Sequence, residues 1–294
     1  EIFANTKELA GYLSLTEVHE AVTKTSHNCS GLGLVSTLAW GLGYFGMPHI
    51  LLRFMAIEDE KKLTTSRRIA SIWVIISMFT AVLIGIVGYN VSVAGRIPFL
   101  ATNSEAETII IQLADLLSRN GVFSASIAGI VLVGILASTM STADSQLLIA
   151  ASSVSQDLLQ GVFRIKLSAR ASMLIARITV LAIACLGIIL AWNPDSSVFS
   201  IVAFAWAGFG AAFGPVVLFS LFWRRSNKWG ALAGILTGSA MVFIWKYGVS
   251  QQGGIFAIYE LLPAFIAACV AIIIVSLITT APSEDVCREF DKIG

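Results

Sequence analysis

The densest group of polar side chains in any apolar stretch of this sequence lies in residues 137–146, which read Ala-Ser-Thr-Met-Ser-Thr-Ala-Asp-Ser-Gln. In an α-helix, three serines of this stretch share one face, and a threonine and an aspartate lie beside it: Ser138, Ser141, Ser145, Thr142 and Asp144. Hydroxyl and carbonyl oxygens are hard ligands, which suit sodium rather than a transition metal. The pattern therefore favours a cation site on a helix.

Other interpretations of this stretch stay open. Small hydroxyl residues are often packing contacts between membrane helices. Asp144 is either a cation or proton site, because an ionisable group at membrane depth is costly, or a hydrogen-bonded helix cap.

A second candidate group is aromatic. Trp40, Tyr44 and Pro48 recur every four residues, so an α-helix would present them on one face, where a small amphipathic solute could stack. Packing or an interfacial belt is the alternative role for these rings. Residues 41–46, Gly-Leu-Gly-Tyr-Phe-Gly, match the dinucleotide fingerprint, but that fingerprint has meaning only between a strand and a helix. We therefore expect no organic cofactor.

The glycines of residues 41–46 and the following Pro48 point to a different property. Within an apolar stretch they predict a helix that unwinds or kinks and so exposes backbone groups to a ligand. Close packing against another helix is the alternative explanation.

The elements that must hold these residues are membrane helices. The chain of 294 residues is 56% hydrophobic and 13% charged, whereas a soluble domain has about 25% charged residues. Its net charge of +1 gives no electrostatic footprint for nucleic acid. A membrane span needs about 20 mainly apolar residues. We predict an all-α membrane protein with a single transmembrane domain over residues 1–294. Seven stretches qualify or nearly qualify as its spans: 31–55, 69–94, 121–150, 173–192, 197–223, 229–247 and 259–280.

The Lys and Arg residues divide unequally between alternate loops. Fourteen of the 19 gather on one side, near residues 53–68, 164–177, 224–228 and 288–292. The other side holds five: Lys7, Lys24, Arg96, Arg119 and Lys246. Since short cytoplasmic loops are enriched in basic residues, the first span should run inward and the C-terminus should be cytoplasmic.

Three local patterns predict smaller features. Ser14 with Glu17, and Ser104 with Glu107, each fit a capping box and predict two short surface helices, the second continuing with amphipathic spacing over residues 109–117. The sixth span carries glycines at every fourth position, which predicts a face for close helix packing: Gly230, Gly234 and Gly238.

With these residues in place, the sequence resembles a known family. Residues 39–53, Ala-Trp-Gly-Leu-Gly-Tyr-Phe-Gly-Met-Pro-His-Ile-Leu-Leu-Arg, resemble the seventh helix of the bacterial sodium/proline symporters, a branch of the sodium:solute symporter family. Ser141 and Thr142, followed by Gln-Asp-Leu at 156–158, resemble that family's ninth helix. The likeness covers the whole chain, which would correspond to helices seven to thirteen. We therefore expect the chain to be part of a longer protein.

The resemblance implies a fold and a set of site residues. The fold is the LeuT-type core of two inverted repeats, with solute and sodium held midway, followed by extra C-terminal helices. The implied solute site comprises Trp40, Gly43, Tyr44 and Pro48. The implied sodium ligands are the side chains of Ser141 and Thr142 and the carbonyl of Ser138.

Further residues are implied more loosely. Phe204 and Trp206 fall near the family's outer-gate aromatics. Asp144 and Ser145 stand where some members hold a second sodium ion with hydroxyl groups, so one sodium site and two are both compatible with the sequence.

The implied function is transport rather than catalysis. It is sodium-coupled symport of a small organic solute, with L-proline favoured, by alternating access in a bacterial plasma (inner) membrane. The expected partners are Na⁺, the solute and the lipid bilayer, and no nucleic acid. Two alternatives stay open: a symporter for another solute, and a channel or membrane scaffold that does not transport.

Overall fold

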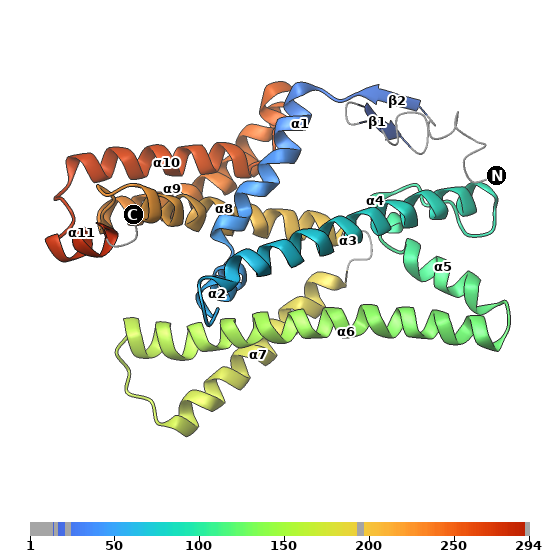
Figure 1. Ribbon diagram of the computed structural model, residues 1–294, viewed down its shortest axis with the longest axis horizontal. Coiled ribbons are helices and arrows are strands. Elements are labelled where there is room, and N and C mark those ends of the chain that lie inside the picture. The colour runs from blue at the N-terminus through green and yellow to red at the C-terminus, as the bar shows by residue number, and fades with distance from the viewer. Residues whose placement is uncertain (1–13, 15–16, 21–24, 193–196, 292–294) are drawn as a thin grey trace. The chain divides into compact units, whose positions relative to one another are not determined.

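The computed structural model describes residues 14, 17–20, 25–192 and 197–291 (Figure 1). This part of the chain divides into two compact units, one within residues 3–66 and 199–294 and the other within residues 67–198. Among the described residues, six helical stretches are long and apolar enough to cross a membrane: Lys62–Val93, Val122–Val162, Ala169–Ala191, Val198–Phe222, Lys228–Gln252 and Leu261–Ile278. The expectation of an all-helical membrane protein is confirmed.

The first predicted span is not one helix. Residues 31–55 form three short helices: α1 Gly31–Leu38, the 3₁₀ helix η1 Ala39–Gly46, and α2 Pro48–Met55. The break falls at Met47, whose extended backbone (φ −82°, ψ 114°) follows from the proline after it, since a residue before proline avoids the α conformation. Pro48 then begins α2, where its missing N–H costs nothing. The predicted interruption of this helix is confirmed, and the unbroken candidate spans in the described chain number six, not seven.

Three long helices form the rest of the first unit: α8 Val198–Phe222, α9 Lys228–Ile244 and α10 Leu261–Ile278. Three short helical turns link α9 to α10: η3 Trp245–Val249, η4 Ser250–Gln252 and η5 Gly254–Ala257. One short helix, α11 Glu284–Asp291, follows α10. Helices α9 and α10 lie side by side (Figure 1). The core joins η1, α8, α9 and α10 through small and apolar side chains: Ala207, Ala211, Val242, Leu261, Ala264 and Phe265.

The glycine face of α9 makes the close packing possible. Gly230, Gly234 and Gly238 are all buried. A side chain at Gly234 would meet Ile272 of α10, and one at Gly238 would meet the backbone of Ala211 in α8. The predicted packing role of these glycines is confirmed.

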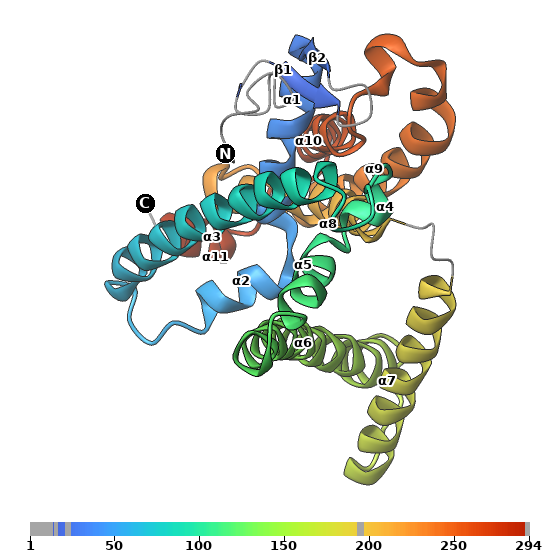
Figure 2. The same cartoon turned by 90° about the vertical axis from the view of Figure 1, so that its right-hand side faces the viewer.

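The second unit is built around a long helix. Its elements are α3 Lys62–Val93, whose first residues belong to the first unit, α4 Asn103–Ala106, α5 Ile109–Ser118, α6 Val122–Ser152, the π-helical η2 Ser153–Val162, and α7 Ala169–Ala191. Helix α6 contacts both α5 and α7, and Figure 2 shows α5 against one end of α6. Ile109 of α5 occupies the space that a side chain at Gly88 of α3 would need.

The predicted surface helix after residue 104 exists, but its cap differs. The Thr102 hydroxyl accepts from the backbone N–H of Glu105 at 3.2 Å, and the Glu105 carboxylate accepts from the N–H groups of Thr102 and Ala101. These hydrogen bonds, that of Thr102 first, hold the pKa of Glu105 below its usual value. Glu107 instead accepts from the Ser197 hydroxyl and the Val198 N–H, at the start of α8. Residues 102–107 contain the capping spacing twice, and the first copy forms the box.

The other predicted surface helix is wrong. Residues 17–20 form strand β1 (Glu17–Glu20), which pairs antiparallel with β2 (Thr25–Asn28), Glu17 opposite Asn28. A helix cap contributes only about 1 kcal/mol, so the capping spacing alone does not decide between helix and strand.

Candidate functional site

Trp40 lies at the centre of a group of stacked rings in the first unit. Its ring stacks on those of Phe199, Trp206 and Tyr259, with centroids 5.4, 5.5 and 5.9 Å away and interplanar angles of 11°, 15° and 15°. The Trp206 indole N–H also donates to the Trp40 carbonyl at 3.0 Å. These contacts fix η1 to α8 and to the start of α10. We call Trp40, Phe199, Trp206 and Tyr259 the ring cluster.

Tyr44 joins the ring cluster by a different geometry from the one the sequence predicts. In a 3₁₀ helix of three residues per turn, positions four apart do not share a face. Trp40 and Tyr44 are instead brought together by Trp206, whose ring meets Tyr44 edge-on at 4.8 Å and 82°. Tyr44 remains 51% exposed, so a solute at its ring could still reach the cluster. Pro48 lies beyond the break, at the first residue of α2.

Gly43 and Gly46 allow η1 to approach α8 closely. A side chain at Gly43 would collide with the Trp206 indole, and one at Gly46 with the carbonyl of Phe209. A Cβ at Gly210 of α8 would lie 2.7 Å from the Gly43 Cα. Both explanations that the sequence offered for these glycines, an interrupted helix and close packing, apply to the same segment.

Phe204, grouped with Trp206 on sequence, belongs to another set of contacts. Its ring meets Phe243 edge-on at 5.3 Å and Tyr247 at 6.0 Å. The Lys246 ammonium lies 6.0 Å from the Phe204 ring centroid. The structure therefore places Trp206 with the candidate solute residues and Phe204 with the end of α9.

Lys246 is also half of a partly buried ion pair. Its Nζ lies 3.2 Å from Oε1 of Glu260, whose side chain is 8% exposed, whereas that of Lys246 is 40% exposed. A buried carboxylate without a partner would cost several kcal/mol, so Lys246 compensates Glu260 at the start of α10.

Sequence reasoning missed Phe199, Tyr259 and Ser36. The Tyr259 N–H donates to the Ser36 hydroxyl at 2.7 Å, and its own hydroxyl donates to the Ala203 carbonyl at 2.6 Å. Tyr259 thus holds α1 and α8 while its ring stacks on Trp40. No spacing rule could find Phe199 and Tyr259, because they lie far from Trp40 in the sequence. An aromatic residue with a polar tip at the start of an apolar span was the available signal.

The candidate sodium residues all lie on α6, in the second unit. The Thr142 hydroxyl donates to the Ser138 carbonyl at 3.1 Å, and the Ser145 hydroxyl donates to the Ser141 carbonyl at 3.0 Å. Each hydroxyl oxygen keeps lone pairs that can face a cation. Both pairs are exposed. These are ordinary hydrogen bonds within one helix, so the sodium-ligand role of Ser138, Ser141 and Thr142 stays a prediction.

Asp144 is exposed on the same helix. It lies between Thr142 and Ser145 in the sequence. It lies inside the continuous helical stretch Val122–Val162 and not at a helix end, so the cap role is wrong. A cation or proton role stays a prediction.

The sequence has characterised relatives. Residues 7–238 match the profile of the sodium:solute symporter family. The chain is 43% identical to a sodium/proline symporter of Haemophilus influenzae over 297 aligned positions, covering 99% of this chain and 57% of the relative. It is 43% identical to the high-affinity proline transporter PutP of Bacillus subtilis, covering 89% and 53%, and 41% identical to the sodium/proline symporter of Escherichia coli, covering 88% and 50%.

The matches cover most of this chain but only part of each relative. The chain spans about half the length of the curated relatives it matches. No solved structure gives a significant match.

Proposed function

Because the chain belongs to the sodium:solute symporter family, a family of membrane transporters with the LeuT-type fold, we propose that it serves the sodium-coupled symport of L-proline. The family implies coupling to Na⁺. Proline is the solute named for relatives that are 41 to 43% identical. We further propose that residues 1–294 belong to one transmembrane domain in a bacterial plasma membrane, with residues 31–55 as one of its spans.

The observation that supports the solute assignment is the ring cluster, which lies next to the interrupted helix of residues 31–55. The apolar methylenes of a proline ring suit the exposed ring of Tyr44, and its ammonium group suits the π-electrons of that ring. Trp40, whose ring is stacked on three others, would border the solute. The break at Met47 frees backbone groups that a carboxylate or ammonium can use. Trp40, Gly43, Tyr44 and Pro48 are therefore our proposed solute residues, with Trp206 as their support.

The sodium ion would use oxygens of α6. Ser141 and Thr142 supply hydroxyls, and Ser138 supplies its carbonyl, which already lies beside the Thr142 oxygen. Asp144 and Ser145 are the proposed residues for a second ion. Phe204 and Trp206 stay proposed as gate residues.

Coupling follows from binding linkage. Sodium that binds the outward-open state better than the inward-open state raises the affinity for solute, and solute must raise the affinity for sodium by the same factor. Release inward would follow a rocking of one helix bundle against the other.

The test is uptake of labelled proline by the purified transporter in proteoliposomes, with and without an inward sodium gradient. We expect accumulation above equilibrium only with the gradient. Passive equilibration that ignores sodium would indicate a channel instead. A competition panel of amino acids, sugars and organic anions would reassign the solute if proline competes no better than the others.

A further inference from the structure

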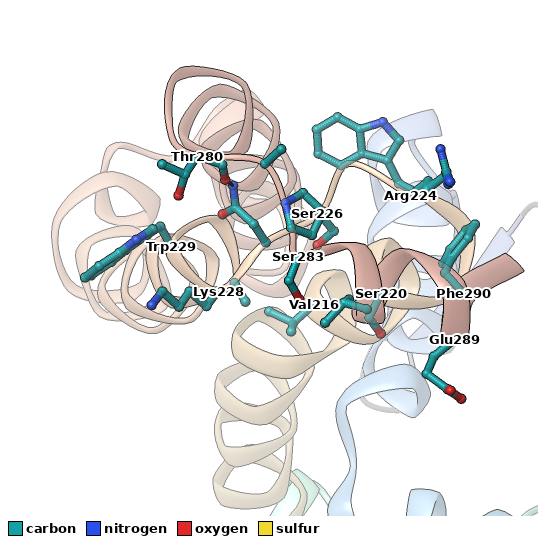
Figure 3. A pocket seen from close by; sticks show the side chains of 16 residues that line it. Val216, Ser220, Arg224, Ser226, Lys228, Trp229, Thr280, Ser283, Glu289 and Phe290 are labelled. Carbon is teal, nitrogen blue, oxygen red and sulfur yellow. Dashed lines mark hydrogen bonds between the residues drawn. The ribbon is translucent and has the colours of Figure 1, made fainter.

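A cavity of about 670 Å³ lies where three candidate membrane helices of the first unit end. Its walls come from the last turns of α8, the loop 223–227, the first turn of α9, the segment after α10, and α11 (Figure 3). Since these helices are long enough to span a bilayer, their ends lie at the depth of the lipid headgroups. This holds whichever way the chain is oriented in the membrane.

The cavity carries two cations and one carboxylate. Arg224 and Lys228 line it from either side of the loop, and Glu289 lines it from α11. Figure 3 shows the Glu289 carboxylate pointing away from the other labelled side chains. Arg225 adds positive charge close by, since its Nη2 donates to the Thr279 carbonyl at 2.9 Å. The mouth of the cavity is therefore favourable to an anion.

Arg224 already holds an anionic group in two-point geometry. Its Nε and Nη2 donate to the two carboxylate oxygens of Asp291 at 2.9 and 2.8 Å. The same fork fits two phosphate oxygens. Both side chains are more than half exposed, 60% and 51%, so water and salt screen this pair and a stronger anion can replace Asp291.

The wall behind these cations is rigid. Asn227 is buried and its Oδ1 accepts from the N–H of Gly230 at 2.8 Å, which caps α9. Its Nδ2 donates to Thr279 Oγ1 at 2.9 Å and to the Thr280 carbonyl at 2.8 Å. One amide thus ties the start of α9 to the end of α10. The loop that carries Arg224 and Lys228 is held in place before any ligand arrives.

The rest of the lining suits the glycerol and upper acyl region of a lipid. Trp223 and Trp229 are of the type that sits at membrane interfaces, and the Lys228 ammonium lies 5.3 Å from the Trp229 ring centroid. The remaining wall has both apolar and hydroxyl side chains. The apolar ones include Val216, Ala231, Val286 and Phe290, and the hydroxyl ones are Ser220, Ser226, Thr280 and Ser283. A free phosphate ion would leave this apolar surface unfilled.

We propose that this cavity is a binding site for the headgroup of an anionic phospholipid, with Arg224 and Lys228 holding its phosphate in place of the Asp291 carboxylate. The site does not depend on the identity of the transported solute. In the proposed orientation the lipid comes from the cytoplasmic leaflet.

Native mass spectrometry of the purified transporter tests the site, with phosphatidylglycerol and phosphatidylcholine of identical acyl chains as probes. We expect phosphatidylglycerol to bind at least about tenfold more tightly, because each basic side chain near a membrane surface contributes to the attraction of anionic lipid. The double substitution Arg224→Gln, Lys228→Gln should reduce that preference to less than about threefold. The matched control is Lys61→Gln, Arg67→Gln, which removes the same charges at the start of α3 and should keep the preference.

Two further substitutions distinguish specific binding of the lipid headgroup in the cavity from general attraction of anionic lipid to positive charge. Arg224→Lys keeps the charge but loses the two-point fork, so it should weaken phosphatidylglycerol binding. Asp291→Asn frees Arg224 and should strengthen it. These milder variants also cover the case in which the double substitution fails to fold.

Several results would overturn the proposal. The first is equal binding of phosphatidylglycerol and phosphatidylcholine by the wild-type protein. The second is an equal loss of the phosphatidylglycerol preference in the control variant. The third is unchanged or weaker phosphatidylglycerol binding in Asp291→Asn. Displacement of phosphatidylglycerol by millimolar glycerol 3-phosphate would show that the cavity takes free phosphate compounds instead of lipid.

Discussion

Trp206 supports the proposed solute residues through two kinds of contact. Its ring stacks on Trp40 and meets Tyr44 edge-on, while its indole N–H donates to the Trp40 carbonyl. That carbonyl belongs to a 3₁₀ helix, where backbone hydrogen bonds have poorer geometry than in an α-helix. Trp206 therefore fixes both the backbone and the ring of Trp40.

The substitution Trp206→Phe separates the two contacts, since it keeps an aromatic ring and removes the donor. A lost neutral hydrogen bond costs about 1 kcal/mol, so we expect the apparent proline constant to rise about fivefold. The measurement is sodium-driven proline uptake. The exposed Trp192 at the end of α7 provides the control, and Trp192→Phe should leave uptake unchanged. Equal effects of both substitutions would show that Trp206 has no special role.

The hydroxyl oxygen of Thr142 is a single atom on which the sodium proposal can be tested. Thr142→Val keeps the shape and removes the oxygen, so the sodium concentration for half-maximal uptake should rise by at least about tenfold, or about 1.4 kcal/mol. Thr139 lies on the same helix and donates to the Ile135 carbonyl at 3.0 Å in the same way. Thr139→Val should change the sodium dependence by less than about twofold. If both variants behave alike, the Thr142 hydroxyl is a packing group.

At the scale of elements, the sequence predicted correctly those features that depend only on residues close together in the chain. The break near Pro48 was predictable because a proline and the residue before it have few allowed conformations. The 3₁₀ conformation of residues 39–46 was not predictable, because it depends on partners such as Trp206, 166 positions from Trp40. The cap at Thr102 was missed because two overlapping copies of one motif compete there. The placement of solute and sodium residues on separate elements was predictable, whereas Phe199 and Tyr259 were not.

The glycine face of α9 gives a prediction at the same scale. Gly238→Ala places a methyl group against the backbone of Ala211, which has no side-chain freedom to yield. We expect the helices to separate and the stability to fall by about 1 to 3 kcal/mol. Gly187 lies in α7 with open space around it, so Gly187→Ala should leave stability equal or raise it by up to about 1 kcal/mol. Denaturation of both variants in detergent measures the difference, and equal stabilities would refute tight packing at Gly238.

For the whole molecule, the unequal distribution of basic residues is the basis of the predicted orientation. Fourteen of 19 Lys and Arg residues gather on the side assigned to the cytoplasm. Of the five on the other side, Lys246 is held by Glu260, so its charge is compensated locally. Ion pairs also occur on the cytoplasmic side, at Lys62, Arg224 and Arg288. The predicted orientation therefore rests on the count of basic residues.

Cysteine labelling tests this orientation. In a background with the four native cysteines replaced, Glu60→Cys and Arg164→Cys should resist a membrane-impermeant maleimide added to intact cells, and should react once the membrane is opened. Asn120→Cys, in the loop between α5 and α6, should react from outside. Labelling of Glu60→Cys in intact cells would reverse the proposed topology.

The packing of α9 on α10 also has a consequence for biosynthesis. The two helices are neighbours in the chain, joined by short turns and held by the glycine face and by Asn227. Contacts so close in sequence form early, whereas those between Trp40 and Trp206 require a long loop to close. During synthesis, residues 31–55 must wait in the membrane until α8, α9 and α10 have emerged and assembled. The interrupted helix therefore reaches its final packing only after these three helices have been made.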